Sequence, residues 1–165
     1  MVTDDGEHLP ATVEIRAVDP ASPVADRCLA EYHAELDDRF ETGFDAGRTR
    51  WSPDEARPPR GVFLVASVWD EPVGCGALRL HDGEPAEIKR MWVAPKMRGL
   101  GVGRRLLAAL EAEAVAHGVT AVRLDTNRAL VEAISLYRSA GFTETAPFTD
   151  DPYAQLWFEK RLVTG

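Results

Sequence analysis

The segment Val93-Ala94-Pro95-Lys96-Met97-Arg98-Gly99-Leu100-Gly101-Val102-Gly103-Arg104-Arg105 runs from a strand pattern, through a glycine-rich turn, into a helical pattern. Three glycines at alternate positions allow a sharp turn and the close approach of a ligand to the backbone. The free amides of the first helical turn point out of the positive end of the helix dipole, which attracts anions. Because arginines flank the turn and can bind phosphate through two hydrogen bonds, the segment predicts a pyrophosphate site.

Two other phosphate motifs do not fit this turn. A P-loop requires GxxxxGK followed by Ser or Thr, whereas Gly103 is followed by Arg104 and Arg105. A dinucleotide fingerprint requires GxGxxG, and reading from Gly99 places Arg104 at the third glycine. Asp125, after the next strand pattern, is typical of that fold, but only about 60 residues follow the turn. That length is too short for the second half of a doubly wound fold.

The patterns around the turn predict one mixed sheet with helices on its faces, an α/β fold of the α+β type. Apolar runs predict strands at 12–18, 61–69, 73–81, 86–94 and 121–125, with two more between 142 and 162. Helical spacing predicts helices at 22–40, 101–117 and 129–140. Asp70-Glu71-Pro72 predicts a hairpin turn. The irregular segment 41–60 predicts a long loop with room for a short helix.

Length and composition indicate one domain without a membrane segment. The chain has 165 residues, of which 45% are hydrophobic, so a single domain over 1–165 is expected, with 1–11 as a flexible tail. It lacks both an apolar run of the ~18 residues that a membrane span needs and the pattern of a signal peptide. A cytoplasmic protein is therefore expected.

The charge is negative overall but contains one basic stretch. A net charge of −8, from 19 basic and 27 acidic residues, argues against an extended surface for nucleic acid or for an anionic membrane. Between Lys89 and Arg105 there are basic residues and no acidic ones. This stretch predicts one compact polyanionic ligand. Cys28 and Cys75 lack the spacing of metal ligands, as do the four histidines, so free thiols and no metal are expected.

With these features the chain resembles the GNAT superfamily of N-acetyltransferases, which bind acetyl-coenzyme A. The family signature, R/Q-x-x-G-x-G/A at a strand-to-helix turn, is matched by Arg98-Gly99-Leu100-Gly101-Val102-Gly103. Leu136-Tyr137, followed by Gly141-Phe142, also resembles the family. The resemblance implies a mostly antiparallel central sheet of six or seven strands, splayed between the fourth and the fifth, with about four helices.

The resemblance also implies that acetyl-coenzyme A binds as a co-substrate, without a metal. Its pyrophosphate would bind the amides of the turn, and its pantetheine arm would pair with the preceding strand. The residues implied are Met91, Trp92, Val93, Arg98, Gly99, Leu100, Gly101, Val102, Gly103 and Arg104. Family members commonly carry an Asn three residues before the helix alanine, but Leu130 occupies that position before Ala133. Asn127 is the candidate replacement, with a simple N-cap as the alternative.

Acetyl transfer to an amine requires a base, a donor for the oxyanion and a proton donor for the leaving thiolate. By resemblance, Tyr137 is the proton donor, and a backbone amide near Trp92 or Val93 would stabilise the oxyanion. Glu87, in the strand before the turn, and Asp125, at the end of the adjacent strand, are the candidate bases. A base acting through water, or one from the substrate loop, is the remaining alternative.

The expected function is direct transfer, in a ternary complex, of the acetyl group of acetyl-coenzyme A to a primary amine of a small molecule, amino acid derivative or peptide. The alternatives are a non-catalytic acyl-coenzyme A-binding regulatory module and a nucleotide-dependent oxidoreductase. Residues 19–60 and the segment 148–153 are expected to select the acceptor. Family members often dimerise, so a homodimer is an expectation from the resemblance alone.

Overall fold

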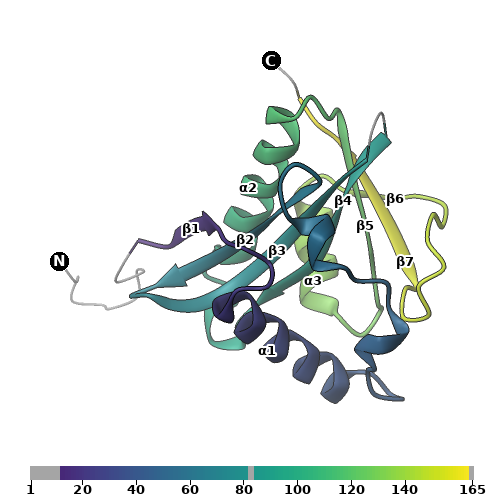
Figure 1. Cartoon of the computed structure of the whole chain (residues 1–165). Helices are drawn as coiled ribbons and strands as arrows, with labels where there is room; N and C mark the ends of the chain where they lie inside the picture. The colour runs from purple at the N-terminus through teal and green to yellow at the C-terminus, as the bar shows by residue number, and fades with distance from the viewer. Residues whose placement is uncertain (1–11, 82–83, 164–165) are drawn as a thin grey trace.

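The computed structural model describes residues 12–81 and 84–163, which form a seven-stranded sheet with helices on both faces (Figure 1). The strand order is β1-β2-β3-β4-β5-β7-β6, and every neighbouring pair is antiparallel except β4 and β5. The strands are β1 (Glu14–Ala17), β2 (Gly61–Val68), β3 (Glu71–His81), β4 (Glu84–Val93), β5 (Ala121–Thr126), β6 (Thr143–Glu144) and β7 (Leu156–Arg161). This sheet confirms the predicted fold class. The tail expected at 1–11 lies outside the described residues.

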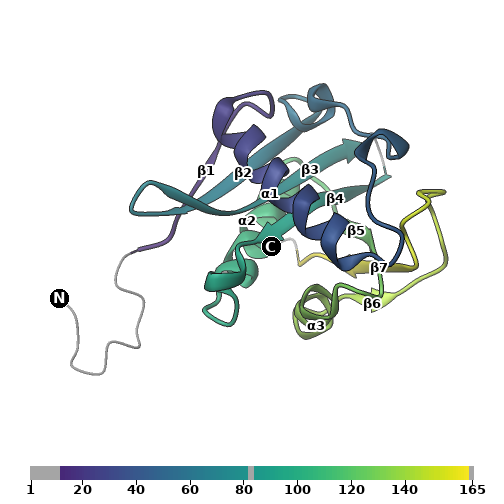
Figure 2. The same cartoon turned by 90° about the horizontal axis from the view of Figure 1, so that it is seen from below.

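The α-helices are α1 (Pro23–Arg39), α2 (Val102–Ala116) and α3 (Val131–Ser139). Figure 2 shows α1 on one face of the sheet and α2 and α3 on the other. Among the described residues three α-helices form where about four helices were expected. The segment 41–60 contains only two short 3-10 helices, η1 (Ala46–Arg48) and η2 (Pro53–Ala56), because its prolines and glycines interrupt longer helical hydrogen bonding. A third, η3 (Pro95–Met97), lies in the turn before α2.

The local signals at the start of α1 and at the first hairpin differ in how well they predict the structure. The Ser22 hydroxyl accepts a hydrogen bond from the Ala25 amide at 3.4 Å, and Pro23 occupies the first turn, as predicted. The hairpin turn lies earlier than predicted, because Trp69 and Asp70 form it with φ angles of 53° and 63°. Two consecutive positive φ angles match the twist of the paired strands, which lets β3 begin at Glu71.

Beta strands β4 and β5 separate soon after they pair. Their parallel register consists of Ala86 opposite Val122 and Glu87 opposite Arg123. Beyond this row, β4 continues along β3 as far as Val93, while β5 continues along β7. The sheet is therefore splayed between its fourth and fifth strands, as predicted.

A buried carboxylate lies in the last row that joins the two strands. Glu87 is 6% exposed, and the register places Arg79 of β3 and Arg123 of β5 on either side of it. Its Oε1 lies 2.8 Å from His81 Nε2, 3.8 Å from an Arg79 nitrogen and 3.9 Å from an Arg123 nitrogen, and its Oε2 lies 3.7 Å from Lys89 Nζ. Burial alone raises the pKa of this carboxyl, but the cations and the His81 hydrogen bond outweigh burial and hold the pKa below its usual value.

Glu87→Gln should lower the free energy of unfolding by about 1–3 kcal/mol at neutral pH, because it leaves partly buried cations without their carboxylate. Since the folded-state pKa lies below the unfolded value of about 4.5, the stabilisation is complete above that pH and is lost as the pH falls below it. The variant should therefore lose less stability on acidification. Urea unfolding at pH 7 and pH 4 measures both effects.

Glu144→Gln is the matched control, because Glu144 of β6 forms an exposed ion pair with Arg138 of α3. This control should change stability by less than about 0.5 kcal/mol. A Glu87→Gln protein as stable as the wild type at pH 7 would contradict the structural role.

Candidate functional site

A cavity of about 440 Å³ lies where the splayed end of β4, the start of α2 and the face of α3 meet. Its walls come from α1, β4, the turn and α3. The residues that line it are Tyr32, Glu35, Leu36, Arg39, Met91, Trp92, Val93, Met97, Arg98, Gly99, Gly101, Val102, Gly103, Arg104, Leu130, Glu132, Ala133, Ser135, Leu136 and Ser139. We refer to this cavity as the first cavity. It includes nearly all of the glycine-rich turn.

The turn presents free backbone donors to the first cavity. Gly99 and Gly101 have φ angles of 79° and 87°, a left-handed conformation that favours glycine. Gly101 is the N-cap of α2 and provides no side chain to cap it, and the first helical hydrogen bond runs from the Arg105 amide to the Gly101 carbonyl. The amides of residues 102–104 therefore precede the hydrogen-bonded part of the helix, where the dipole is positive. Such a group of amides can accommodate an anion.

Gly103 is required for packing rather than for its backbone angles. A Cβ at this position would lie 2.9 Å from Leu136 Cδ2 and 3.4 Å from Val93 Cγ2. Glycine therefore lets α2, α3 and β4 approach one another closely at the base of the turn.

Arg98 is held by one acidic residue of α1, Glu35, at the edge of the first cavity. Its Nη2 donates to Glu35 Oε2 at 2.5 Å, and Glu35 also accepts from Arg39 at 3.0 Å. Arg39 in turn donates to Glu132 and to the Ala129 carbonyl, which links α1 with α3 across the cavity. This chain of contacts fixes the Arg98 guanidinium in the cavity that the first residues of α2 also line.

Strand β4 has a bulge next to both cavities. Cys75 pairs with Trp92 and Ala77 with Lys89, so Arg90 and Met91 together face the single residue between Cys75 and Ala77. Arg90 has a φ angle of 56°, and its carbonyl accepts a hydrogen bond from the buried Cys75 thiol at 3.3 Å. The bulge changes the direction of the Arg90 side chain relative to a regular strand.

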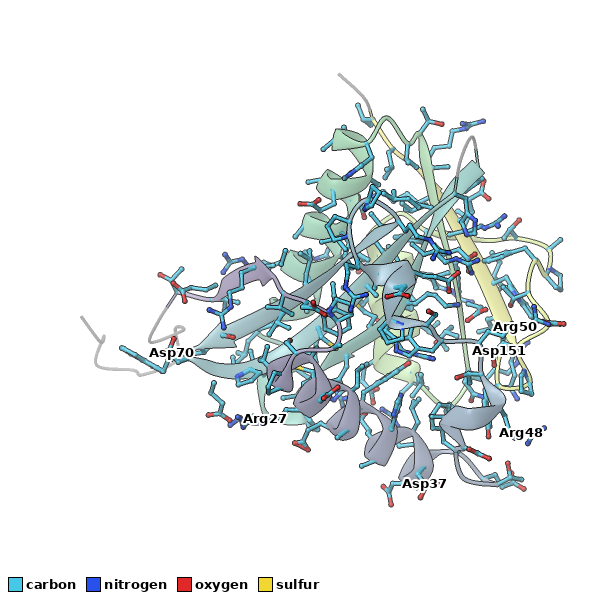
Figure 3. The ribbon with its side chains drawn as sticks, in the orientation of Figure 1. Arg27, Asp37, Arg48, Arg50, Asp70 and Asp151 are labelled. Carbon is cyan, nitrogen blue, oxygen red and sulfur yellow. The ribbon has the colours of Figure 1, made fainter. Side chains whose placement is uncertain are left out.

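A second, smaller cavity of about 70 Å³ lies on the other side of the β4 bulge. It shares Tyr32, Leu36, Met91, Leu130 and Ala133 with the first cavity, so the two have a common wall. Its other lining residues are Phe40, Phe44, Thr49, Ile88, Lys89, Arg90, Asp125, Thr126, Asn127, Tyr137, Asp151, Tyr153 and Ala154. Figure 3 shows Arg48 and Asp151 at the end of the molecule where the loop after α1 meets the loop before β7. The Tyr153 hydroxyl joins these loops by accepting from the Asp45 amide at 2.8 Å.

Asp125 lines the second cavity at the end of β5. Its Oδ2 accepts a hydrogen bond of 2.6 Å from the Thr149 hydroxyl, which itself accepts from the Trp157 indole at 2.9 Å. Burial raises the pKa of the Asp125 carboxyl above its usual value, although the Thr149 hydrogen bond and nearby Lys89 partly oppose this. Asp125 therefore holds its proton more strongly than an exposed aspartate does.

Tyr137 of α3 lines the same cavity. It is 4% exposed, and its ring packs against Phe142 and Phe158 with centroid distances of 5.9 and 6.2 Å. Burial raises the pKa of its hydroxyl well above the usual value, so the group is protonated at any physiological pH.

The fold agrees with comparisons to known proteins. A sequence model described as the acetyltransferase (GNAT) family matches residues 27–142. The chain belongs to this family. It is 43% identical over 105 residues to the IAA acetyltransferase of Azospirillum brasilense, an alignment that covers 61% of this acetyltransferase and 67% of the relative.

Solved structures of other family members share the fold. A putative acyl-CoA N-acyltransferase from Klebsiella pneumoniae superimposes with a TM-score of 0.74 at 28% identity, covering 92% of this acetyltransferase and 99% of that chain. A putative streptothricin acetyltransferase from Bacillus anthracis, solved in complex with acetyl coenzyme A, has a TM-score of 0.67 at 17% identity and covers 92% and 99% of the two chains. The comparisons confirm the predicted family and support an acetyl-coenzyme A-dependent acyltransferase.

The structure brings most of the implied coenzyme residues of this acetyltransferase together in the first cavity. Leu100 is an exception, because it is 42% exposed and does not line the cavity. Asn127 is another, since it lines only the second cavity. Its Nδ2 donates to the Tyr153 carbonyl and its Oδ1 accepts from the Ala129 amide, both at 2.9 Å. These bonds brace the loop before α3, which begins after Leu130. Direct contact of Asn127 with the coenzyme stays a prediction.

The structure separates the two candidate bases of this acetyltransferase. Asp125 and Tyr137 line the second cavity, whereas Glu87 lines neither cavity and faces the cations of its row. The catalytic roles of all three residues stay predictions, but their surroundings favour Asp125 over Glu87 as a base.

Sequence reasoning missed Glu35, Arg39 and Tyr32, which line the first cavity from α1, and it placed Arg90 only within the basic stretch. One signal could have singled out Arg90. Lys89 and Arg90 are successive basic residues in a strand whose side chains should alternate between faces, and such a break in alternation is typical of a bulge. The α1 residues carry no comparable signal.

In the part of this acetyltransferase that the structure describes, no helix is long and apolar enough to cross a membrane. Within the same ranges, no group of three or more His, Cys, Asp or Glu side chains is arranged to hold a metal ion. Cys28 and Cys75 are buried free thiols. The cytoplasmic location and the homodimer stay predictions.

Proposed function

We propose that this acetyltransferase acts as a single domain that moves the acetyl group of acetyl-coenzyme A directly to a primary amine of a small molecule, in a ternary complex. The observation that carries the proposal is the common wall of the two cavities at the splay. One cavity presents free amides to an anion, and the other contains a carboxyl group and a buried phenol. An acyl donor and an amine acceptor bound in them would meet without a covalent enzyme intermediate.

The residues of the first cavity fit the coenzyme. The amides of residues 102–104 and Arg98 would hold the pyrophosphate, and the edge of β4 from Met91 to Val93, where β5 has departed, would hold the pantetheine arm. When bound, acetyl-coenzyme A supplies an acetyl group already activated as a thioester. Glu35 and Arg39 position Arg98 for this contact.

Asp125 is the proposed general base of the second cavity. An alkyl ammonium has a pKa of about 10.4 and must lose a proton before its nitrogen can attack. The raised pKa of Asp125 makes it a stronger base than an ordinary aspartate. Glu87 is a weaker base, because its cations hold its pKa down.

Tyr137 is proposed to donate a hydrogen bond to the departing sulfur. Its pKa lies above that of an ordinary thiol, about 8.5, so complete transfer of the proton to the thiolate is unfavourable. Its hydroxyl nevertheless always has a proton to donate, and a charge-assisted hydrogen bond would stabilise the developing negative charge.

Release of free thiol from acetyl-coenzyme A, measured against a panel of small amines, tests the proposed function. We expect amine-dependent release and an acetylated amine by mass spectrometry. A protein that binds acetyl-coenzyme A but releases no thiol above background with any amine would instead be the non-catalytic binding module.

Coenzyme A binding by calorimetry is the companion measurement. Arg98→Ala should weaken binding by about tenfold, because one charge-assisted contact is lost. Arg105→Ala removes the same charge from an exposed position outside the first cavity and should bind as the wild type does.

Asp125→Asn should lower kcat/KM by about 10²–10⁴-fold, because the base is lost while the Thr149 hydrogen bond is kept. In the wild type, activity should rise with pH through an apparent pKa above 3.8, and this acidic limb should disappear in the variant. Since burial disfavours the ionised carboxyl in the folded protein, the variant should be at least as stable as the wild type at neutral pH. A variant with wild-type kcat/KM would exclude Asp125 as the base.

Tyr137→Phe should reduce kcat by about 10- to 100-fold and leave the KM for acetyl-coenzyme A nearly unchanged. The ring packing against Phe142 and Phe158 is preserved, so thermal stability should hold. Initial rates of thiol release at saturating substrate measure the change in kcat. Unchanged turnover would remove Tyr137 from the reaction.

A further inference from the structure

Arg90 is a partly buried cation in the wall of the second cavity. Its Nη2 donates to the Thr49 hydroxyl at 3.0 Å, and its guanidinium lies 4.8 Å from the centre of the Trp51 ring. Its Nε is buried and has no hydrogen-bond partner among the described residues. No ion pair within 4.0 Å includes Arg90 in the described parts of the chain. The fold has therefore placed a positive charge in the wall of the second cavity and left part of it unsatisfied.

Removing the Arg90 guanidinium from water costs free energy unless a ligand pairs with it. Buried charges are normally paired, because removal from water disfavours the charged form. Burial lowers the pKa of Arg90 by more than the nearby Tyr32, Asp151 and Asp125 raise it, so these groups do not fully offset this cost. A guanidinium binds carboxylates through two parallel hydrogen bonds, so an anionic group of a ligand is the matching partner.

The two acidic residues of the second cavity accept hydrogen bonds from other groups, and neither forms an ion pair with Arg90 within 4.0 Å. Asp125 accepts from the Thr149 hydroxyl at 2.6 Å, and Asp151 accepts from the Tyr153 amide at 2.8 Å. Lys89 lines the same cavity and lies 3.7 Å from Glu87. The cavity wall thus carries two cationic and two anionic side chains. This distribution suits a ligand that has one positive and one negative group.

The size and position of the cavity restrict that ligand further. The small enclosed volume, about 70 Å³, favours a compact ligand. Arg90 does not line the first cavity, so the phosphates proposed to bind at the turn do not account for it. Tyr32 lines both cavities, and burial raises the pKa of its hydroxyl to about 12, so it remains a hydrogen-bond donor beside Arg90.

We propose that the acceptor is a small amino acid or a similar aminocarboxylic acid whose carboxylate binds Arg90 and whose amine faces Asp125. The inference rests on the proposed function, because it assigns the acceptor of that reaction. It adds a specificity-determining residue, Arg90, and requires a negative charge near the reacting amine. Simple amines and amides would lack that charge.

Matched ligands test this proposal without any variant. Each standard L-amino acid is compared with its α-amide and with its decarboxylated amine, first by calorimetric binding to the coenzyme A-bound protein and then by thiol release from acetyl-coenzyme A. We expect at least one acid to bind about 10- to 100-fold more tightly than its amide, and its kcat/KM to be higher by a similar factor.

Arg90→Gln supplies the second test. It should raise the KM of the preferred acid by about 10- to 100-fold and change the KM of the matching amide by less than about threefold. Arg50→Gln is the control, because the Arg50 side chain is 90% exposed and the substitution removes the same charge. Thermal unfolding and coenzyme A affinity show whether the Arg90→Gln protein is folded.

The outcomes separate the two proposals. If amides and simple amines bind and react as well as acids, the carboxylate assignment is overturned while the acetyltransferase function stands. If acids bind selectively through Arg90 but no thiol is released, the carboxylate site is supported and the proposed function fails. If no acid binds better than its amide and no amine reacts, both proposals are wrong.

Discussion

The contact on which the site depends is the row of Arg79, Glu87 and Arg123, where β4 and β5 are last paired. One buried carboxylate binds cations on both neighbouring strands and thereby joins the strands at a fixed point. Beyond that point the strands diverge, so the edge of β4 is free of a partner. Both cavities lie along this free edge. Without a fixed row, neither the position nor the width of the opening would be defined.

The two acidic residues near the splay show how one chemical group acquires opposite properties. Glu87 is surrounded by cations that hold its pKa down, whereas burial raises the pKa of Asp125. The opposite directions of their pKa shifts do not come from the side-chain chemistry, because both groups are carboxyls, one in β4 and one in β5. They follow from what each strand places beside them. Glu87 therefore helps to join the strands, whereas Asp125 keeps the higher pKa that the proposed base requires.

The sequence predicted the order and kind of nearly all elements, because strand alternation, the Ser22-Pro23 helix start and the glycine-rich turn are local signals. Most of the coenzyme residues that the sequence implied line the first cavity, because half of that lining comes from the segment 91–104. It could not place Glu35 or Arg39 there, because helix α1 meets the turn only in the folded chain. It also left Glu87 and Asp125 equivalent, as only the register reveals their different neighbours. The early hairpin turn at Trp69-Asp70 escaped prediction because neither residue is a glycine.

The missing side chain at Gly103 has a mechanical consequence. Leu136 fills the space that a Cβ would occupy, and the next residue along α3 is Tyr137. The packing of α3 against the turn thus also sets the position of the Tyr137 side chain, although it lies on a different face of the helix. A larger residue at position 103 would push α3 away from the turn. It would shift the Tyr137 hydroxyl without touching it, even where the backbone of the turn kept its shape.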